Sequence, residues 1–328
     1  MDGLILAGDV GGTKTDLGLF KYSTGTLELV REQRYATAKF NSLEAVCAEF
    51  LGASASVNAA CLGVPGPIID GRAHATNVPW ELSSAALSRV MKGVPVRLLN
   101  DLAAIAYGMV NLKPEDFAVL HRAENPPAHG NIAVIAAGTG LGESSLVWEG
   151  DRYYAVASEG GHSDFAPHDA EQIELLRFLS GEFGHVSYER VLSGPGLWNI
   201  YKFLRRESHA DEPAWLSGQI AAGDASAAVS EAAIAGRDPV CVRALTIFCD
   251  IYGSEAANLA LKVLALGGVY LGGGIAPKIL PMLTNGTFVR GFLAKGRLNE
   301  ILKRIEVRVA LNPAAGLIGA AHVAAAML

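Results

Sequence analysis

Two short segments of this chain share one layout: an apolar strand, a tight glycine turn and a second strand. In the first, residues 4–7 lead into Gly-Asp-Val-Gly-Gly-Thr-Lys-Thr, and residues 16–20 follow. In the second, residues 131–137 lead into Gly-Thr-Gly-Leu-Gly, and residues 144–148 follow. This internal similarity predicts two α/β halves that descend from one duplicated unit.

The length of 328 residues also favours two lobes, because single hydrophobic cores stop growing near about 250–300 residues. A break at Leu112-Lys113-Pro114 predicts a small lobe of residues 1–112 and a large lobe of residues 113–311. The closing helix, within residues 312–328, is expected to pack back on the small lobe.

Apolar spacing predicts the helices and strands between these landmarks. Ser42 suits the cap of a helix over residues 42–51. A strand over residues 94–99 stops at Asn100 and Asp101, so these two polar residues lie at the carboxyl end of a strand. Further helices are expected at 83–91, 170–183, 195–206, 214–221, 225–235, 239–264 and 314–327, and further strands at 27–35, 58–64, 117–120, 269–271 and 305–310.

Composition argues against several functional classes. A net charge of −6 gives no general attraction for nucleic acid or anionic membrane surfaces. The start of the chain has no basic region before a long apolar run, and no stretch reaches the about 18 apolar residues that span a bilayer, so a cytoplasmic location is expected. The four cysteines form no Cys-x-x-Cys pair, which favours buried, reduced thiols.

The glycine clusters favour a nucleotide site. Gly11, Gly12 and Thr13 lack the Gly-Lys-Ser/Thr ending of a Walker A loop, and a strand rather than a helix follows them. Backbone amides freed by glycine can nevertheless approach a phosphate, although a plain glycine hairpin is an alternative. Two more clusters strengthen the nucleotide hypothesis: Gly138, Thr139 and Gly140, and Gly272, Gly273 and Gly274.

The order of these motifs resembles bacterial glucokinase, of the hexokinase, actin and heat-shock-chaperone ATPase superfold. The resemblance runs over essentially the whole chain and includes ATNVPW, SEGGHSDFAP and HVSYERVLSGPGL. It implies a two-lobed α/β fold of the actin-like ATPase (ribonuclease H-like) class with its active site in the cleft between the lobes. It implies transfer of the γ-phosphate of ATP to the 6-hydroxyl of glucose, as in glycolysis, and a homodimer. The zinc motif of related repressors is absent after His162, so zinc is not expected.

The resemblance also assigns roles to residues. Asp101 matches the catalytic base, and Asp9 matches the acid that faces Mg²⁺ and the phosphates, through water. The residues that match sugar ligands are Asn77, Asn100, Asp101, Glu159, His162 and Glu189. The residues that match the ATP-binding turns are Asp9, Gly11, Gly12, Thr13, Gly138, Thr139 and Gly140, with Gly272, Gly273 and Gly274 at the adenosine.

Each role has a simpler alternative. Asp101 could only cap a helix that begins near Leu102, His162 could be structural, and Glu189 could be a solvated charge. His168 and His185 are expected at the surface or at helix ends, without a metal.

Other functions also stay open. The chain could phosphorylate another hexose or an amino sugar, or it could be a non-catalytic sugar-responsive protein. An actin-like ATPase would explain the glycine turns but not the sugar-binding set.

Overall fold

A computed structural model describes residues 2–328 of the protein, except 53–55, 75–77, 79 and 209–210. The chain divides into two compact units. The first comprises Met1–Asp116, Ser144–Ala157 and Asn312–Leu328, and the second comprises Phe117–Glu143 and Ser158–Leu311. The sequence prediction set the first boundary at residue 112 and left residues 144–157 in the large lobe. Those residues are grouped with the first unit, where the backbone N–H of Ala155 donates to the Tyr107 hydroxyl (3.0 Å).

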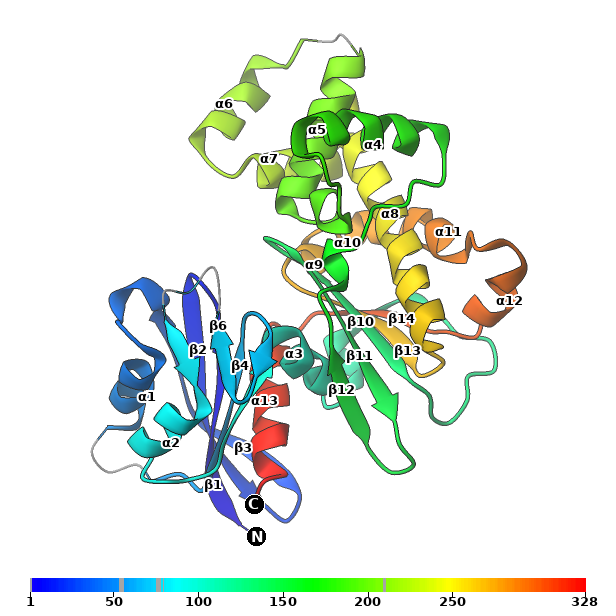
Figure 1. Ribbon diagram of the computed structural model, residues 1–328. Coiled ribbons are helices and arrows are strands. Elements are labelled where there is room, and N and C mark those ends of the chain that lie inside the picture. Colours follow the sequence, from blue (N-terminus) through cyan, green and yellow to red (C-terminus); the bar gives the residue numbers. More distant parts are fainter. Residues whose placement is uncertain (1, 53–55, 75–77, 79, 209–210) are drawn as a thin grey trace. The chain divides into compact units, whose positions relative to one another are not determined.

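The first unit is built on a five-stranded sheet. Its strands are β1 (Gly3–Val10), β2 (Lys14–Ser23), β3 (Thr26–Ala36), β4 (Ala59–Val64) and β8 (Val96–Asn100). They lie in the order β3-β2-β1-β4-β8 (Figure 1). β1, β4 and β8 are parallel, whereas β2 is antiparallel to both of its neighbours. The carboxyl ends of β1, β4 and β8 therefore meet at one edge of the sheet.

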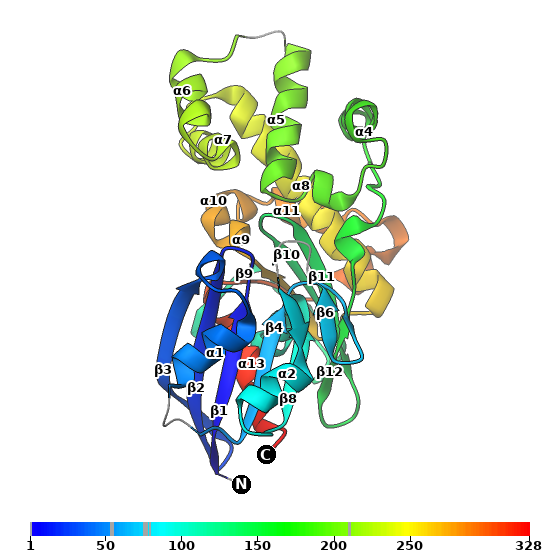
Figure 2. The same cartoon turned by 60° about the vertical axis from the view of Figure 1, so that its left-hand side comes forward.

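Helices cover both faces of this sheet. The helices are α1 (Leu43–Leu51), α2 (Ser84–Val90), α3 (Asp101–Met109) and α13 (Ala315–Ala325). Side chains alternate along β1, so that Leu6 packs with the residues of α1 and α2, while Ile5 and Ala7 pack with those of α3 and α13. Figures 1 and 2 show α13, in red, on the face of the sheet opposite to α1.

The predicted cap of the first helix is confirmed. The Ser42 hydroxyl caps α1 by accepting a hydrogen bond from Ala45 N (3.2 Å). A small antiparallel sheet in this unit was not predicted. It consists of β5 (Ile68–Ile69), β6 (Arg72–His74) and β7 (Glu81–Ser83).

Two helices cross closely in the first unit, at glycines. A Cβ at Gly319 of α13 would lie 1.9 Å from the carbonyl oxygen of Ala104 in α3, and one at Gly108 would lie 2.0 Å from that of Ala315. The absence of side chains at both positions lets α13 pack directly on α3.

The second sheet has six strands. They are β9 (Phe117–His121), β10 (Ile132–Ala137), β11 (Leu141–Trp148), β12 (Tyr153–Ala157), β13 (Gly268–Gly272) and β14 (Val307–Ala310). Their order is β12-β11-β10-β13-β14-β9, with β10, β13 and β14 parallel. The strand Tyr153–Ala157 was not predicted.

The second unit carries most of the helices. They are α4 (Ala170–Phe183), α5 (Gly194–Ser208), α6 (Ala214–Ala222), α7 (Ala225–Ile234), α8 (Pro239–Val263), α9 (Ile275–Lys278), α10 (Leu280–Leu283), α11 (Thr287–Leu293) and α12 (Asn299–Leu302). Helix α8 is central, and Asp238 caps it by accepting a hydrogen bond from Cys241 N (2.8 Å). None of the helices in the described part of the chain is long and apolar enough to cross a membrane.

Candidate active site

The first glycine turn joins β1 to β2 and is held by a residue from a later segment. Gly11 N donates to the carbonyl oxygen of Lys14 (2.8 Å). The Thr37 hydroxyl donates to the Gly11 carbonyl oxygen (2.8 Å), and the Thr37 backbone N–H donates to the Thr13 carbonyl oxygen (3.1 Å). Thr37 is buried and thus fixes both ends of the turn.

Asp9 lies half-buried near the carboxyl end of β1. Burial and the adjacent carboxylate of Asp16 raise the pKa of the Asp9 carboxyl, against the smaller opposing effect of Lys14. Asp16 itself is bound by Arg34 through two hydrogen bonds (2.6 and 3.0 Å). A Cβ at Gly316, in the first turn of α13, would lie only 2.9 Å from Asp9 Oδ2, so the positive end of that helix lies close to this carboxylate.

No residue in the described part of the chain hydrogen-bonds to the Asp9 carboxylate. A half-buried carboxylate that already experiences a second negative charge favours a cation beside it. Carboxylate oxygens are also ligands that Mg²⁺ accepts, commonly with several of its waters kept. The residues present therefore fit a hydrated Mg²⁺ at Asp9.

Asn100 and Asp101 lie where β8 passes into α3. The Asn100 side chain, 8% exposed, caps the helix: its oxygen accepts from Leu102 N (3.0 Å) and Ala103 N (3.3 Å), and its nitrogen donates to the Gly66 carbonyl oxygen (3.3 Å). The alternative that Asp101 is the N-cap is wrong, because Asp101 is the first residue of α3. Asp101 Oδ1 accepts from Leu102 N (2.8 Å), which fixes the orientation of its carboxylate.

The second glycine turn joins β10 to β11 and is held by two later segments. Gly138 N donates to the Gly140 carbonyl oxygen (2.8 Å), and Gly194 N donates to the Gly138 carbonyl oxygen (2.8 Å). Glu189 Oε2 accepts from Leu141 N (3.0 Å), directly after the turn. The end of the turn is therefore held by the Glu189 side chain, a residue that was predicted as a sugar ligand.

Glu189 also faces the loop that carries Glu159 and His162. Its Oε1 lies 4.0 Å from His162 Nδ1. Glu159 and His162 are exposed, on either side of Gly160 and Gly161. A Cβ at Gly161 would lie 2.0 Å from the Leu141 carbonyl oxygen, so glycine is what allows this loop to pack against β11. His162, Glu189 and the second glycine turn thus form one connected group within the second unit.

The third glycine cluster lies beside the second turn in the same unit. Gly272 ends β13 and pairs in register with Ala136 of β10. Gly273 has φ of 78°, and a Cβ there would lie 2.3 Å from the Ala137 carbonyl oxygen. Gly274 precedes α9, and no atom lies within 4 Å of where its Cβ would be. Bare backbone is thus presented beside the second glycine turn.

The predicted site residues thus fall into two groups. The first unit holds Asp9, Gly11, Gly12, Thr13, Asn100 and Asp101, and the second holds Gly138, Thr139, Gly140, Glu159, His162, Glu189, Gly272, Gly273 and Gly274. Asn77 lies outside the described residues.

Sequence reasoning missed Thr37, Asp16 and Glu143. No motif marks Thr37 or Asp16, because their partners become neighbours only in the folded chain: Thr37 bonds to the first glycine turn and Asp16 to Arg34. Glu143 stands directly after Gly142 and is 1% exposed, and its polar neighbours Ser144 and Ser145 gave no sign of this burial.

His168 and His185 were expected at the surface or at helix ends. His185 is exposed and lies 2.8 Å from Asp164. His168 Nε2 lies 2.9 Å from Asp250 Oδ2, in a cluster with Asp169 whose geometry could hold a metal ion. Gln172 Nε2 donates to the same Asp250 oxygen (2.8 Å). The cluster is therefore already linked by hydrogen bonds and needs no ion to explain it.

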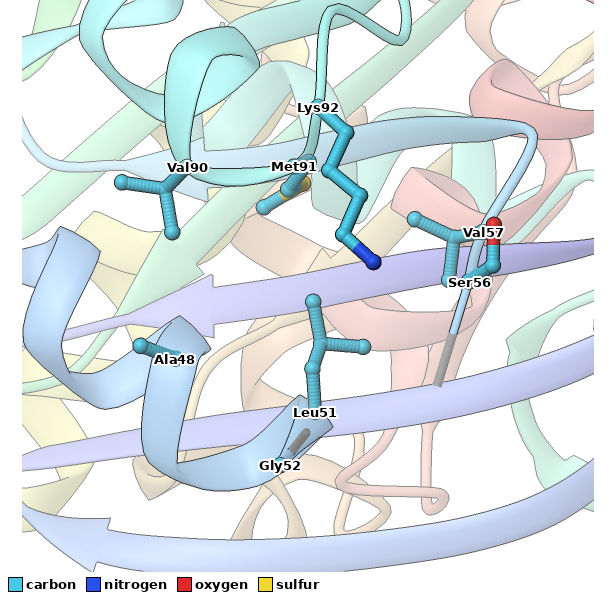
Figure 3. A pocket seen from close by; sticks show the side chains of 8 residues that line it. All are labelled: Ala48, Leu51, Gly52, Ser56, Val57, Val90, Met91 and Lys92. Carbon is cyan, nitrogen blue, oxygen red and sulfur yellow. The ribbon is translucent and has the colours of Figure 1, made fainter. Parts of the chain in front are cut away.

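A pocket in the first unit is distinct from the predicted site. It lies at the ends of α1 and α2 and is lined by Ala48, Leu51, Gly52, Ser56, Val57, Val90, Met91 and Lys92 (Figure 3). Val57 precedes β4, so the pocket is at the amino ends of the parallel strands, whereas Asp9 and Asp101 are at their carboxyl ends. Ligands of α/β sheets bind at carboxyl ends, and the pocket is not assigned to the site.

Comparison with known proteins gives concordant results. A family model described as glucokinase matches residues 6–327. A glucokinase of Synechocystis sp. is 41% identical over 346 residues, covering 98% of this chain and 97% of the relative. The crystal structure of a glucokinase from an Antarctic psychrotroph has a TM-score of 0.86 at 31% identity and covers 98% of this chain and 99% of its own. A ROK family glucokinase from Streptomyces griseus, solved with glucose and AMPPNP, has a TM-score of 0.67 at 25% identity, covering 99% and 100%.

Proposed function

This chain belongs to the glucokinase family, with the two-sheet α/β fold of actin-like ATPases, and on that premise we propose that it transfers the γ-phosphate of ATP to the 6-hydroxyl of glucose. Glucose 6-phosphate and ADP are the products, and the reaction is the first step of glycolysis. The observation that carries the proposal beyond family membership is the bond from Leu141 N to Glu189, since it ties a predicted sugar ligand to a predicted phosphate turn.

We propose Asp101 as the general base. Its carboxylate takes the proton of the 6-hydroxyl while that oxygen attacks the γ-phosphorus, and the bond to the leaving ADP oxygen breaks. Two features support the assignment. The carboxylate follows a strand end, and its hydrogen bond from Leu102 N holds one of its oxygens in a fixed orientation.

The remaining residues bind and orient the substrates. We propose that Asn77, Asn100, Glu159, His162 and Glu189 bind the sugar hydroxyls, that Gly11–Thr13 and Gly138–Gly140 bind the phosphates, and that Gly272–Gly274 bind adenosine. Mg²⁺ bound with the nucleotide would be held by Asp9 through water. Its positive charge would offset the negative charge of the phosphate oxygens. Positioning and charge neutralisation supply most of the catalysis of phosphoryl transfer.

The test is a coupled assay for glucose 6-phosphate with ATP and Mg²⁺. For Asp101→Asn we expect kcat to fall about 10²- to 10⁴-fold, the range for loss of a general base, while glucose still binds. The matched control is Asp151→Asn at an exposed turn, which is expected to keep wild-type turnover. Ordinary turnover by Asp101→Asn would remove this residue from the mechanism, and a panel of hexoses and amino sugars would reveal a different substrate preference.

A homodimer and a cytoplasmic location complete the proposal, and both rest on family membership. Light scattering after size exclusion measures the first, and a molar mass that stays at 34.4 kDa over the micromolar range would contradict it.

A further inference from the structure

Two carboxyl groups are buried together beneath the loop that carries Glu159 and His162. Glu143 of β11 is 1% exposed and Glu255 of α8 is 0% exposed. The two side chains are within hydrogen-bonding reach of each other. Within the described part of the chain, one oxygen of each carboxyl, Oε1, is buried without a hydrogen-bond partner. Two adjacent carboxylates have no hydrogen to share, and a single proton held between them would supply one.

Glu143 forms the floor of the loop. A Cβ at Gly160 would lie 2.2 Å from Glu143 Oε2, so this carboxyl lies directly against the loop backbone. The Glu143 carbonyl oxygen accepts from the Ser158 hydroxyl (3.0 Å), and Ser158 Oγ in turn accepts from Gly160 N (3.2 Å). Glu143 is therefore linked through Ser158 to the backbone of the loop that carries Glu159 and His162.

Glu255 connects this pair of carboxyl groups to the segment that carries Glu189. Asn258 Nδ2 donates to Glu255 Oε2 (2.7 Å) and lies 3.0 Å from the Tyr188 hydroxyl, which also hydrogen-bonds to Glu255. Tyr188, 3% exposed, directly precedes Glu189. The backbone N–H of Tyr188 donates to the Ser163 carbonyl oxygen (3.0 Å), one residue after His162. The network therefore reaches both segments that carry proposed sugar ligands.

We propose that Glu143 and Glu255 share one proton, and that this protonated pair is a positioning device that holds Glu159, His162 and Glu189 in the arrangement that binds the sugar. The inference rests on the proposed function, because it concerns the same sugar ligands. Neither carboxyl touches substrate in this role, and each acts through the loops that it supports.

The charges around the pair agree with a single proton. Lys262 of α8 approaches Glu255 Oε1 (3.6 Å) and provides one positive charge. Lys295 donates to Ser254 (2.9 Å) and also acts on Glu255, but burial lowers its pKa. Burial and the charge of Glu255 together raise the pKa of Glu143 to about 8.

The aromatic hydroxyls that face the pair stay neutral in the same range. Burial raises the pKa of Tyr188 and of Tyr252, the two tyrosines that interact with Glu255 and Glu143. The pKa near 8 is therefore that of the Glu143 carboxyl, which is buried beside Glu255, and not that of a tyrosine.

The sign of the pH effect follows from the geometry. Below the raised pKa the pair holds its proton, and the Glu143 carboxyl stays packed against the loop backbone at Gly160. Above it, two buried carboxylates repel each other against Gly160. The protonated form therefore binds glucose more tightly, and affinity falls as pH rises through the pKa. Because linkage is reciprocal, glucose binding must raise that pKa and take up protons.

The experiment is isothermal titration calorimetry of glucose into the whole protein, without nucleotide, at pH 7.0, 8.0 and 9.0. Repeating the pH 8.0 titration in buffers of different ionisation enthalpy measures the protons taken up. We expect proton uptake at pH 8.0 and a glucose Kd about fivefold weaker at pH 9.0 than at pH 7.0, at the low end of usual coupling. In Glu143→Gln, which mimics the neutral carboxyl, both effects disappear while Kd at pH 7.0 is retained.

Glu182→Gln is the matched control, because this carboxyl is partly exposed on α4 and pairs with Lys202. This variant is expected to keep the wild-type proton uptake. Any proton uptake by the N-terminal amine would also be unchanged in it. Glu255→Gln is the second variant should Glu143→Gln fail to fold, and it must also abolish the uptake near pH 8.0.

Two outcomes overturn the inference: a wild-type protein that binds glucose without proton uptake at pH 8.0, or an uptake that survives in Glu143→Gln. The wild-type measurement decides even if neither variant folds. Absence of both glucose binding and turnover at pH 7.0 would instead refute the proposed function.

Discussion

The first sheet runs β3-β2-β1-β4-β8, and the second runs β12-β11-β10-β13-β14 before adding β9. In each, the glycine turn follows the third strand of that order, and the two strands beyond it are parallel to it. When the two turn sequences are aligned, Gly11 corresponds to Gly138 and Asp9 to Ala136. The scaffold is thus repeated, but the acid is not.

The last shared strand shows the same contrast. Asn100 follows Leu99 in β8 and accepts from Leu102 N (3.0 Å), and Asn312 follows β14 and accepts from Ala314 N (3.0 Å). The next residue is Asp101 in one case and Pro313 in the other. The two strand ends therefore share an asparagine whose side-chain oxygen accepts from the backbone N–H two residues later, whereas only the first asparagine is followed by a carboxylate, that of the proposed base Asp101.

The largest effect that tests this contrast is expected at Asp9. For Asp9→Asn we expect kcat to fall about 100-fold, as for loss of one electrostatic contact to a transition state, and the Mg²⁺ concentration for half-maximal rate to rise. Because the pKa of Asp9 is raised in the fold, its charged form costs stability at neutral pH. The variant should therefore melt at a higher temperature than wild type while turning over more slowly. A variant that is both less active and less stable would contradict this account.

The second prediction tests whether the two units unfold separately when one close backbone contact in each is disturbed. Gly319→Ala puts a methyl group 1.9 Å from an α3 carbonyl in the first unit, and Gly253→Ala puts one 2.0 Å from the Phe288 carbonyl in the second. Each is expected to cost about 1–3 kcal/mol of unfolding free energy, as overpacking does. Hydrogen exchange should accelerate mainly in the unit that carries the change.

Gly181→Ala is the control for these substitutions, because no atom lies within 4 Å of the added Cβ in α4. It is expected to be neutral or to stabilise by up to about 1 kcal/mol. Equal acceleration of exchange in both units by either variant would show that the units do not unfold separately.

A smaller effect is expected from the residue that joins sugar and phosphate binding. Glu189→Gln weakens the bond to Leu141 N, and a hydrogen bond to a charged group contributes about 1.5–3 kcal/mol. Since part of this bond is retained by the amide oxygen, we expect KM to rise about three- to tenfold for both glucose and ATP. Glu159→Gln, in which no turn contact is lost, should raise KM for glucose alone. An unchanged KM for ATP in Glu189→Gln would show that the bond to Leu141 N does not couple sugar binding to the phosphate-binding turn.

The smallest effect is expected at the thiols. Cys47 and Cys61 lie in the first unit and Cys241 and Cys249 in the second, all buried. Burial raises the pKa of Cys61 and of Cys241 to about 12, so at pH 8 these thiols stay protonated and unreactive. A chromogenic disulfide reagent should leave activity intact for an hour, and should label the thiols only as urea opens each unit. Rapid labelling of the native protein would contradict the burial described.

The sequence was sufficient for the elements whose local signals agree with the fold. The strand-turn-strand segments, the Ser42 cap and the helix over residues 170–183 are confirmed, because each depends on neighbours within a few residues. The family was also identified from short motifs, and the family model confirms it.

What could not be predicted depends on contacts between distant segments. Thr37 holds a turn that lies more than twenty residues earlier, and Glu143 meets Glu255 only because α8 packs on β10, the strand next to β11. The short sheet at residues 68–83 and the four-residue helices α9, α10 and α12 have too few residues to show a period. The roles of the sugar ligands came from resemblance, and they stay predictions.

The position of α13 has a consequence for how the protein is made. This helix supplies Leu317, Ala320 and Ala321 to the core beneath β1 and β4, yet it is translated after every residue of the second unit. A nascent chain can complete the second unit while the first still exposes that apolar face to the ribosome surface and to chaperones. The first unit, which carries Asp101, therefore lacks part of its core until the whole of the second unit has been synthesised.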